Sequence, residues 1–340
     1  MLDVALDRLR SGLCVLPAIL AEKRPALTGW KQYQRRLPTE QQVRTWFVDA
    51  PTLCLLTGAA SGGLEMIDFD LEGELFERWR ELVDEEYPGL FDRLVVERSQ
   101  SGGRHVVYRC EATVPGSSKL AQRILVAPSG NPVVIAGKTY IPRRAGDRFE
   151  VTVTLIETRG EGGLFLCAPS PGYALEHGRF DRLPKLTESE RAVLIETACV
   201  LNEVTPPATE SLYSATICGR PGDDFNERGD VRAILHRHRW TLARSGANEH
   251  WRRPGKERGC SATLKNGVFY VFSSNAAPFE PARAYAPFAV YALLEHAGDF
   301  AKAAAALRAE GYGEDASGEV VDLSHIICAQ TEPVVEPPEA

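Results

Sequence analysis

Two acidic residues, Asp68 and Asp70, close an apolar segment that has the composition of a β-strand. Side chains alternate along a strand, so residues two apart face the same way and these two carboxylates lie side by side. Adjacent carboxylates repel each other unless a cation lies between them. Hard oxygen ligands suit Mg²⁺ or Mn²⁺. The pattern predicts a divalent-metal site; the alternative is a pair of solvated acids at a strand end.

A glycine-rich turn follows in the sequence, made of Ser101, Gly102, Gly103, Arg104 and His105. Two adjacent glycines let backbone amides approach an anion closely. The arginine and the histidine add further hydrogen-bond donors. The segment therefore predicts a turn that holds a phosphate group; the alternative is a Gly-Gly hairpin with an incidental histidine.

A third group of functional side chains, Glu157 and Arg159, precedes the glycine-rich stretch at 160–163. The two residues are two apart in an expected strand and so share a face. Glu157 is a candidate third metal ligand. Arg159 is a candidate phosphate contact or a charge partner for the acids. The alternative is a surface salt bridge beside a glycine-rich turn.

Short apolar runs and helical spacing predict the elements that carry these groups, and together they indicate an α+β protein. Strands are expected at 53–56, 64–68, 94–96, 106–108, 133–135, 151–157 and 164–168, and helices at 73–87 and 187–204. The first 50 residues are expected to form a helix, a strand, a basic loop and a second helix with Thr39 as its N-cap. Residues 222–312 are expected to add a helix at 227–238, strands near 240–251 and 268–272, and helices at 284–296 and 299–310.

The composition is that of an ordinary globular protein of about two domains, with 340 residues, 44% of them hydrophobic and 25% charged. No apolar run approaches the ~18 residues of a membrane span. The amino-terminal segment has an Asp in its charged part and a break at Pro17, so it makes a poor signal peptide and a cytoplasmic location is expected. None of the 8 cysteines forms a C-x-x-C pair, which predicts buried free thiols and no zinc module.

The net charge of −7 is unevenly distributed along the chain. Residues 313–340 carry seven acids and no Lys or Arg, which leaves the rest neutral. Residues 227–258 hold nine Lys or Arg against four acids, a net charge of +5. A neutral body with one basic stretch is compatible with a strand-binding groove. The acidic, proline-rich tail has the composition of a disordered linker.

The three motifs in this order resemble the archaeo-eukaryotic primase superfamily, and most closely the bifunctional primase-polymerase domain of plasmid, phage and integrated-element replication proteins. Its D-x-D strand, its small-x-His strand and its later acid-ending strand correspond here to IDFD, SGGRH and LIETRGEGG. The flanking segments VLPAILAEKRPALTGW, LLTGAASGGLEMIDFD and GGLFLCAPS also match. The resemblance covers roughly residues 8–180. The third acid, Glu157, departs from the Asp of many members, but its longer side chain still reaches a metal.

The resemblance implies an RNA-recognition-motif-like catalytic core with a mixed or antiparallel sheet, followed by a smaller α+β accessory domain. The expected division is 1–186 for the catalytic domain, 187–218 for a helix and linker, 219–312 for the accessory domain and 313–340 for the tail. Family members often carry a helicase further on, so a helicase domain or protein is an expected partner beyond residue 340. Gly137, Lys138 and Thr139 do not form an ATPase phosphate loop, because Pro132 stands where that motif needs a glycine.

The function implied is template-directed joining of nucleoside triphosphates on single-stranded DNA by a DNA primase and polymerase. Two Mg²⁺ or Mn²⁺ ions would be held by Asp68, Asp70 and Glu157. His105, Ser101 and the glycine amides would hold the incoming nucleotide, with Arg159, Lys23 and Arg104 as weaker candidates for the same role. Candidate DNA contacts in the basic stretch are Arg237, Arg239, Trp251, Arg252, Arg253 and Lys256, with Trp240 as a further stacking residue.

Three other functions fit the same residues. A two-metal nuclease would cleave DNA without a nucleoside triphosphate. A catalytically inactive replication protein would bind DNA without metal dependence. A nucleotidyltransferase that signals or modifies would incorporate nucleotides without regard to a template.

Overall fold

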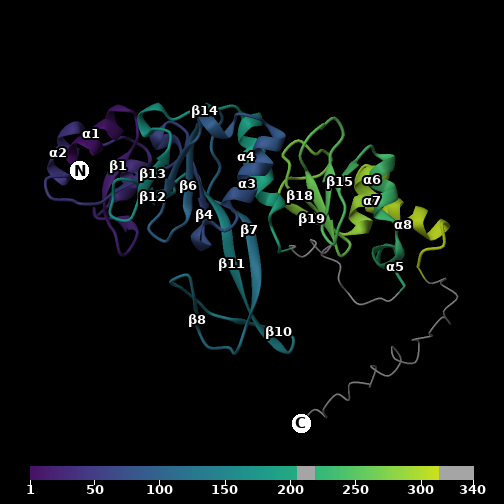
Figure 1. Ribbon diagram of the computed structural model, residues 1–340. Coiled ribbons are helices and arrows are strands. Elements are labelled where there is room, and N and C mark those ends of the chain that lie inside the picture. Colours follow the sequence, from purple (N-terminus) through teal and green to yellow (C-terminus); the bar gives the residue numbers. More distant parts are fainter. Residues whose placement is uncertain (205–218, 314–340) are drawn as a thin grey trace, which may run out of the picture.

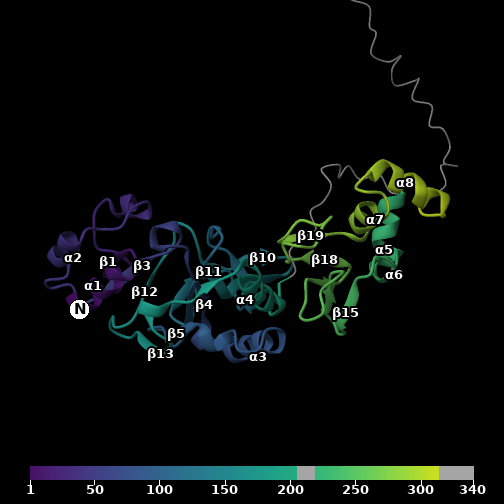
Figure 2. The same ribbon diagram turned by 90° about the horizontal axis from the view of Figure 1, so that it is seen from above.

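The computed structural model of the chain describes residues 1–204 and 219–313, and these form two parts that follow one another in a row (Figures 1 and 2). The first part carries the helices α1 (Leu2–Arg10), α2 (Glu40–Trp46), α3 (Phe76–Glu86) and α4 (Glu188–Val200). The second carries α5 (Pro221–Arg228), α6 (Val231–Arg237), α7 (Pro287–Glu295) and α8 (Phe300–Ala309). Each part has its own sheet, so the expected α+β class is confirmed. The expected linker at 205–210 and the acidic tail beyond 313 lie outside the described residues.

The main sheet of the first part is antiparallel apart from one short parallel pair. Its strands are β4 (Leu64–Phe69), β5 (Val95–Arg98), β6 (Arg104–Cys110), β7 (Lys119–Ala127), β10 (Arg143–Ala145), β11 (Arg148–Arg159), β13 (Ala174–His177) and β14 (Lys185–Leu186). The strand order is β10-β11-β4-β6-β5-β13, with β7 also paired to β11 and β14 parallel to β6. The D-x-D strand, the histidine strand and the third acid's strand are therefore neighbours at the centre of the sheet.

The two faces of the main sheet are covered by different elements. On one face, Ile67 and Phe69 pack into a core that includes Trp79 of α3 and Leu194 of α4. The Trp79 indole N–H donates to the Leu194 carbonyl at 3.0 Å, which ties the two helices together. On the other face, Met66 packs into a second core beside α1 and α2. Because side chains alternate along β4, Asp68 and Asp70 belong to the Met66 face.

A smaller sheet lies on that second side of the main sheet. Its strands are β1 (Val15–Ile19), β2 (Arg24–Pro25), β3 (Leu53–Leu56) and β12 (Leu164–Leu166), in the order β12-β3-β1-β2. Thr39 caps α2 as expected, in a reciprocal pair with Gln42. The six cysteines within the described residues are free, and all but Cys260 are buried. This agrees with the expectation of buried thiols.

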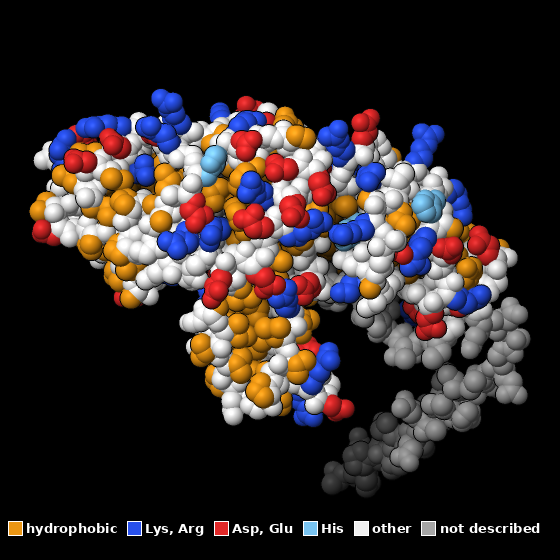
Figure 3. All heavy atoms as spheres, viewed as in Figure 1, with side chains coloured by type: hydrophobic (Ala, Val, Ile, Leu, Met, Phe, Trp, Pro, Cys, Tyr) orange, Lys and Arg blue, Asp and Glu red, His pale blue; other side chains and the backbone are white. Residues whose placement is uncertain are grey.

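Strands β7 and β11 continue beyond the core as a long ribbon that forms a projecting arm, residues 119–150 (Figure 1). The arm also carries β10 and a separate hairpin of β8 (Val133–Ile135) and β9 (Lys138–Tyr140). One face of it is largely apolar and open to solvent, as Figure 3 shows, with Val126 65%, Val134 70% and Ile141 77% exposed. The β8–β9 hairpin pairs only with itself. The hairpin is thus joined to the main sheet through the β7–β11 ribbon, and it contacts the sheet again where Lys138 pairs with Asp70.

The second part is built on an antiparallel sheet whose strands follow chain order. They are β15 (Thr241–Arg244), β16 (Glu249–Arg252), β17 (Ala262–Lys265), β18 (Val268–Val271) and β19 (Arg283–Tyr285). The prediction of a single helix at 227–238 is wrong, since α5 ends at Arg228 and α6 begins at Val231. Gly229 is extended there, and the Asp230 side chain accepts from the Ala233 amide as a new N-cap.

A buried cluster of charges joins the second part to the first. The Lys256 ammonium lies 2.7 Å from Glu86 of α3 and 2.5 Å from Glu196 of α4. Around it, Cys260 and Tyr270 pack against the core beneath α3 and α4. The two parts therefore share a packed contact at the helices of the first part.

Candidate functional site

Four polar side chains form one row across the centre of the main sheet. Glu157 on β11 is directly opposite Asp68 on β4, and Asp68 is directly opposite His105 on β6. His105 is in turn opposite Glu97 on β5. Directly opposed residues of antiparallel strands have side chains on the same face, a few ångströms apart. Strand register, and not sequence proximity, therefore assembles the site.

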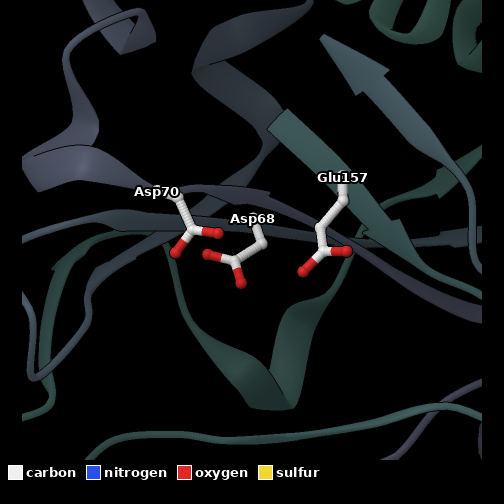
Figure 4. A group of neighbouring side chains, drawn as sticks. All are labelled: Asp68, Asp70 and Glu157. Carbon is white, nitrogen blue, oxygen red and sulfur yellow. The ribbon is translucent and has the colours of Figure 1, made fainter. Parts of the chain in front are cut away.

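Asp70 completes an acid cluster with Asp68 and Glu157, in which one ligand atom of each residue lies within 4.8 Å of the others (Figure 4). Asp70 follows the last residue of β4, and its amide donates to the Leu155 carbonyl at 2.9 Å, which extends the strand geometry by one residue. The exposed fractions of the three side chains are only 16%, 12% and 16% for Asp68, Asp70 and Glu157. The three predicted metal ligands are brought together as expected.

The electrostatics of the cluster favour a bound cation. Burial raises the pKa of Asp68, and the charge of Asp70 raises it further, while His105 opposes the shift. Burial also raises the pKa of Glu157, against the nearby charge of Arg159. Three half-buried carboxylates at this separation offer only hard oxygen donors, which are the ligands that Mg²⁺ and Mn²⁺ prefer. The residues present therefore fit a divalent ion.

Two basic side chains already neutralise part of this acid charge. Arg159 donates from Nη2 to Glu157 at 2.5 Å, which is the charge pairing expected from their spacing. Lys138, on the β8–β9 hairpin, places its Nζ 2.7 Å from both carboxylate oxygens of Asp70. Sequence reasoning missed this residue as part of the site, because 68 positions separate it from Asp70 and no local motif marks it.

His105 is held by a buried partner that sequence reasoning also missed. Its Nδ1 lies 2.8 Å from Glu97, and its Nε2 lies 3.7 Å from Asp68. The other oxygen of Glu97 accepts from the Ala168 amide at 2.8 Å. Burial lowers the pKa of His105, but the hydrogen bond to Glu97 and the charge of Asp68 outweigh it and raise the pKa overall. The signal for Glu97 was its position in the strand that pairs with the histidine strand.

The glycines of the 101–105 turn are required by close packing of the backbone. A Cβ on Gly103 would lie 2.3 Å from the Phe69 carbonyl, next to Asp70. Gly102 has a φ of +84°, in the left-handed region, and its amide donates to the Ser99 carbonyl at 3.0 Å. That amide is therefore already bonded within the turn, contrary to the expectation that it holds a phosphate. The glycines let the turn approach the end of β4.

The remaining predicted nucleotide contacts lie at different distances from the acids. Arg104 is opposite Phe69 in the register, on the sheet face away from His105, and it pairs with Glu176 at 2.6 Å. The structure thus does not bring Arg104 into the acid cluster, because adjacent residues of a strand face opposite ways. Lys23 lies near enough for its charge to oppose the raised pKa of His105. The Ser101 hydroxyl is exposed, 3.3 Å from that of Ser99.

The predicted DNA contacts of the basic stretch do not form one open surface. Trp251 and Trp240 are 0% and 2% exposed and belong to the core of the second part, so the expectation that they stack on bases is wrong. Lys256 is enclosed between two acids, as described above. Arg237 pairs with Glu295, and Arg252 and Arg253 donate to backbone carbonyls. Arg239 is exposed, at a positive φ of 62°.

Residues 5–187 match the family model described as bifunctional DNA primase/polymerase, N-terminal. The chain belongs to this family. The match covers the acid cluster, His105 and the β8–β9 hairpin, and it ends before the second part of the structure. A search of curated proteins finds no sequence match.

Membership confirms the resemblance seen in the motifs. It supports a nucleotidyltransferase-type enzyme that acts on DNA and nucleotides, and enzymes of this family use divalent metals. Among the described residues, no helix is long and apolar enough to cross a membrane.

Proposed function

We propose that this primase-polymerase chain joins nucleoside triphosphates on a single-stranded DNA template during DNA replication. The observation that carries the proposal is the convergence of Asp68, Asp70 and Glu157 to within 4.8 Å, inside the segment that matches the family. Paired divalent ions at such a cluster are suited to nucleotidyl transfer, since they act on both the attacking and the leaving oxygen.

The three carboxylates would hold the ions, Mg²⁺ or Mn²⁺, on the face of the main sheet to which Met66 belongs. The chemistry such ions supply is activation of a primer 3′-hydroxyl and neutralisation of the triphosphate. The hydroxyl oxygen forms a bond to the α-phosphorus as the bond to the leaving pyrophosphate breaks. The protein's contribution is positioning and charge stabilisation, which dominate phosphoryl-transfer catalysis.

His105 would bind the incoming nucleotide as a cation. Glu97 accepts from Nδ1, so a protonated ring directs its Nε2 N–H toward the acid cluster, where the phosphates would lie. Arg159, Lys23 and Ser101 are the other proposed phosphate contacts. Gly102, Gly103 and Arg104 would act by shaping the turn that carries them.

We also propose a separate role for residues 219–312 as an accessory domain that contacts nucleic acid, with 1–186 as the catalytic domain. Arg237 keeps 62% of its side chain exposed despite its ion pair. Exposed arginines of this kind contribute salt-dependent phosphate contacts. Arg237, Arg239, Arg252 and Arg253 are the candidates that remain once Lys256 and the buried tryptophans are left out.

The test is incorporation of labelled nucleotides on single-stranded DNA with Mg²⁺ or Mn²⁺, with and without a primer. Wild type is compared with Asp68→Asn/Asp70→Asn and with Asp49→Asn, an exposed acid outside the site. Template-dependent products are expected from wild type and Asp49→Asn only, and unprimed products identify a primase. The double variant is expected to fold, since it removes like charges that repel, and circular dichroism checks this.

The rival functions give distinct results in the same assay. A template that shortens without added triphosphate indicates a nuclease. A template that is bound but not copied, with no metal dependence, indicates a binding protein. Products that ignore the template indicate another nucleotidyltransferase. Synthesis by the folded double variant would overturn the proposal itself.

A further inference from the structure

Lys138 reaches the acid cluster from outside the main sheet. It is the first residue of β9, directly after a turn in which Ala136 and Gly137 have positive φ of 46° and 76°. Tight two-residue turns of this kind reverse a hairpin sharply. The tip of the β8–β9 hairpin lies at the acid cluster, because the Lys138 ammonium is 2.7 Å from both oxygens of Asp70.

This contact differs from an ordinary surface ion pair, which contributes roughly 0–1 kcal/mol. The Asp70 side chain is only 12% exposed, and both of its oxygens are engaged by one ammonium. The charge of Lys138 also opposes the raised pKa of Asp68 and of Glu157. One lysine thus acts on all three acids of the cluster.

The same contact competes with a metal ion for Asp70. An ion that binds these oxygens is repelled by the Lys138 ammonium, a like charge 2.7 Å from both of them, so binding is favoured when the Nζ moves away. The hairpin that carries Lys138 pairs only with itself and belongs to the projecting arm, so no strand of the main sheet is hydrogen-bonded to it. A lysine is a compact charge on a long flexible stem, so a small shift moves it to a new anion.

The arm carries the charge that such a shift requires. Residues 119–150 hold six Lys or Arg against two acids, a net charge of +4 in a chain whose total is −7, and of these Arg123 at the base of the arm is paired with Glu74 and Glu203. A polyphosphate beside the acid cluster would attract this segment.

We propose that Lys138 exchanges partners during the reaction: it holds Asp70 before substrate binds, and it contacts the triphosphate of the incoming nucleotide once ions occupy the acids. This exchange rests on the proposed function. It adds a nucleotide contact from a hairpin that lies outside the three sequence motifs. The exchange also makes metal binding and nucleotide binding favour each other. A bound metal ion releases Lys138 for the triphosphate, and a bound triphosphate draws Lys138 away from Asp70.

Lys138→Gln tests the exchange, with Lys185→Gln as the matched control. Lys185 is exposed on β14, opposite Arg109, four residues along β6 from His105. Two quantities are measured on the full chain without template. One is the affinity for Mn²⁺ alone, from the electron paramagnetic resonance signal of free Mn²⁺. The other is the affinity for a fluorescent nucleoside triphosphate in the presence of Mn²⁺.

The exchange predicts opposite changes in the two affinities. Lys138→Gln should bind Mn²⁺ alone about tenfold more tightly, because the competing ammonium is gone, and should bind the triphosphate about tenfold more weakly, because a charge-assisted contact is lost. Lys138→Arg should restore the triphosphate affinity toward wild type, since it keeps the charge. Lys185→Gln should change neither affinity.

Two results would overturn the inference. If wild type binds Mn²⁺ and Lys138→Gln binds it with the same affinity, there is no competition for Asp70. If the triphosphate affinity is unchanged, Lys138 does not contact the phosphates. In both cases the proposed function stands, because the acid cluster still binds metal. If wild type binds no Mn²⁺, both the inference and the metal site of the proposed function fail.

Discussion

At the scale of single residues, the site depends on charges that are buried together in a fixed order. Glu97 is 0% exposed and uses one oxygen for His105 and the other for the Ala168 amide. A buried carboxylate is stable only when it is fully paired in this way. Glu97 therefore orients the His105 ring and favours its charged form, which makes it a positioning residue.

Glu97→Gln is expected to lower the pKa of His105, because the hydrogen bond and the negative charge that raise it are weakened and burial then dominates. In wild type, the raised pKa of His105 contributes free energy of folding. This contribution is fully present at pH values below ~6.5, the ordinary pKa of histidine, and it is lost as the pH rises through the raised pKa. The stability advantage of wild type over Glu97→Gln should therefore grow as pH falls through this window. Nuclear magnetic resonance titration of His105 and denaturation at several pH values measure both effects.

The exposed residue Glu111, after β6, provides the control for this prediction. Glu111→Gln should leave the His105 titration unchanged. An unchanged titration in Glu97→Gln as well would show that Glu97 does not set the charge of the ring. Nucleotide incorporation is expected to fall about tenfold in Glu97→Gln, because this is the order of magnitude for the loss of one charge-assisted hydrogen bond.

At the scale of elements, the end of β4 decides where the acids lie. Because side chains alternate between the two faces of β4, Ile67 and Phe69 pack into the core under α3 and α4, and Asp68 and Asp70 lie on the opposite face. The turn before β6 fixes that end from the side, because Gly103 meets the Phe69 carbonyl with no room for a side chain. Packing of a glycine turn thus positions two acids of the cluster.

Gly103→Ala is expected to displace the end of β4, since the new Cβ would meet a backbone oxygen at 2.3 Å. Shifts on the order of 1 Å at a catalytic group cost about 10²-fold in rate. Nucleotide incorporation should fall by about that factor, with a smaller loss of thermal stability. Gly116→Ala is the matched control, because a Cβ there meets nothing within 4 Å. Equal activity of the two variants would show that the turn does not position the acids.

At the scale of the whole molecule, a single lysine joins the two parts. Lys256 of the second part lies between Glu86 and Glu196 of the first, with exposed side-chain fractions of 12%, 8% and 8%. Burial raises the pKa of Glu86, and the charge of Lys256 opposes that rise. Removing one member of such a cluster leaves charges buried without a partner. The basic stretch of the sequence therefore contributes to the contact between the parts.

Lys256→Gln is expected to weaken that contact by about 3 kcal/mol, the order of magnitude for breaking a buried ion pair. Chemical denaturation should show a lower midpoint and separate transitions for the two parts. Arg258→Gln, at a nearby exposed arginine, should leave a single curve like that of wild type. If Lys256→Gln is as stable as wild type and single-stranded DNA binding falls instead, Lys256 is a DNA contact.

The sequence by itself predicted the three acids and the histidine as site residues, and the order along the chain of the strands that carry them. Strand alternation is a local rule, so the D-x-D pattern predicted a shared face for Asp68 and Asp70, and Thr39 marked the start of α2 in the same local way. Its place in an expected strand made Glu157 a candidate third acid, and the family resemblance supported this. These features depend on short-range geometry or on spacing along the chain.

Only the tertiary structure decided which distant residues complete the site. Lys138 reaches the site through a hairpin that folds back, and no local pattern encodes this approach. Glu97 reaches it through the register of β5 on β6, which the expected strands indicate but do not fix. The same reason explains the errors at Trp251 and Lys256, where composition indicated a nucleic-acid surface but packing buried both side chains. Charge along the sequence does not reveal burial, because burial depends on which elements pack together.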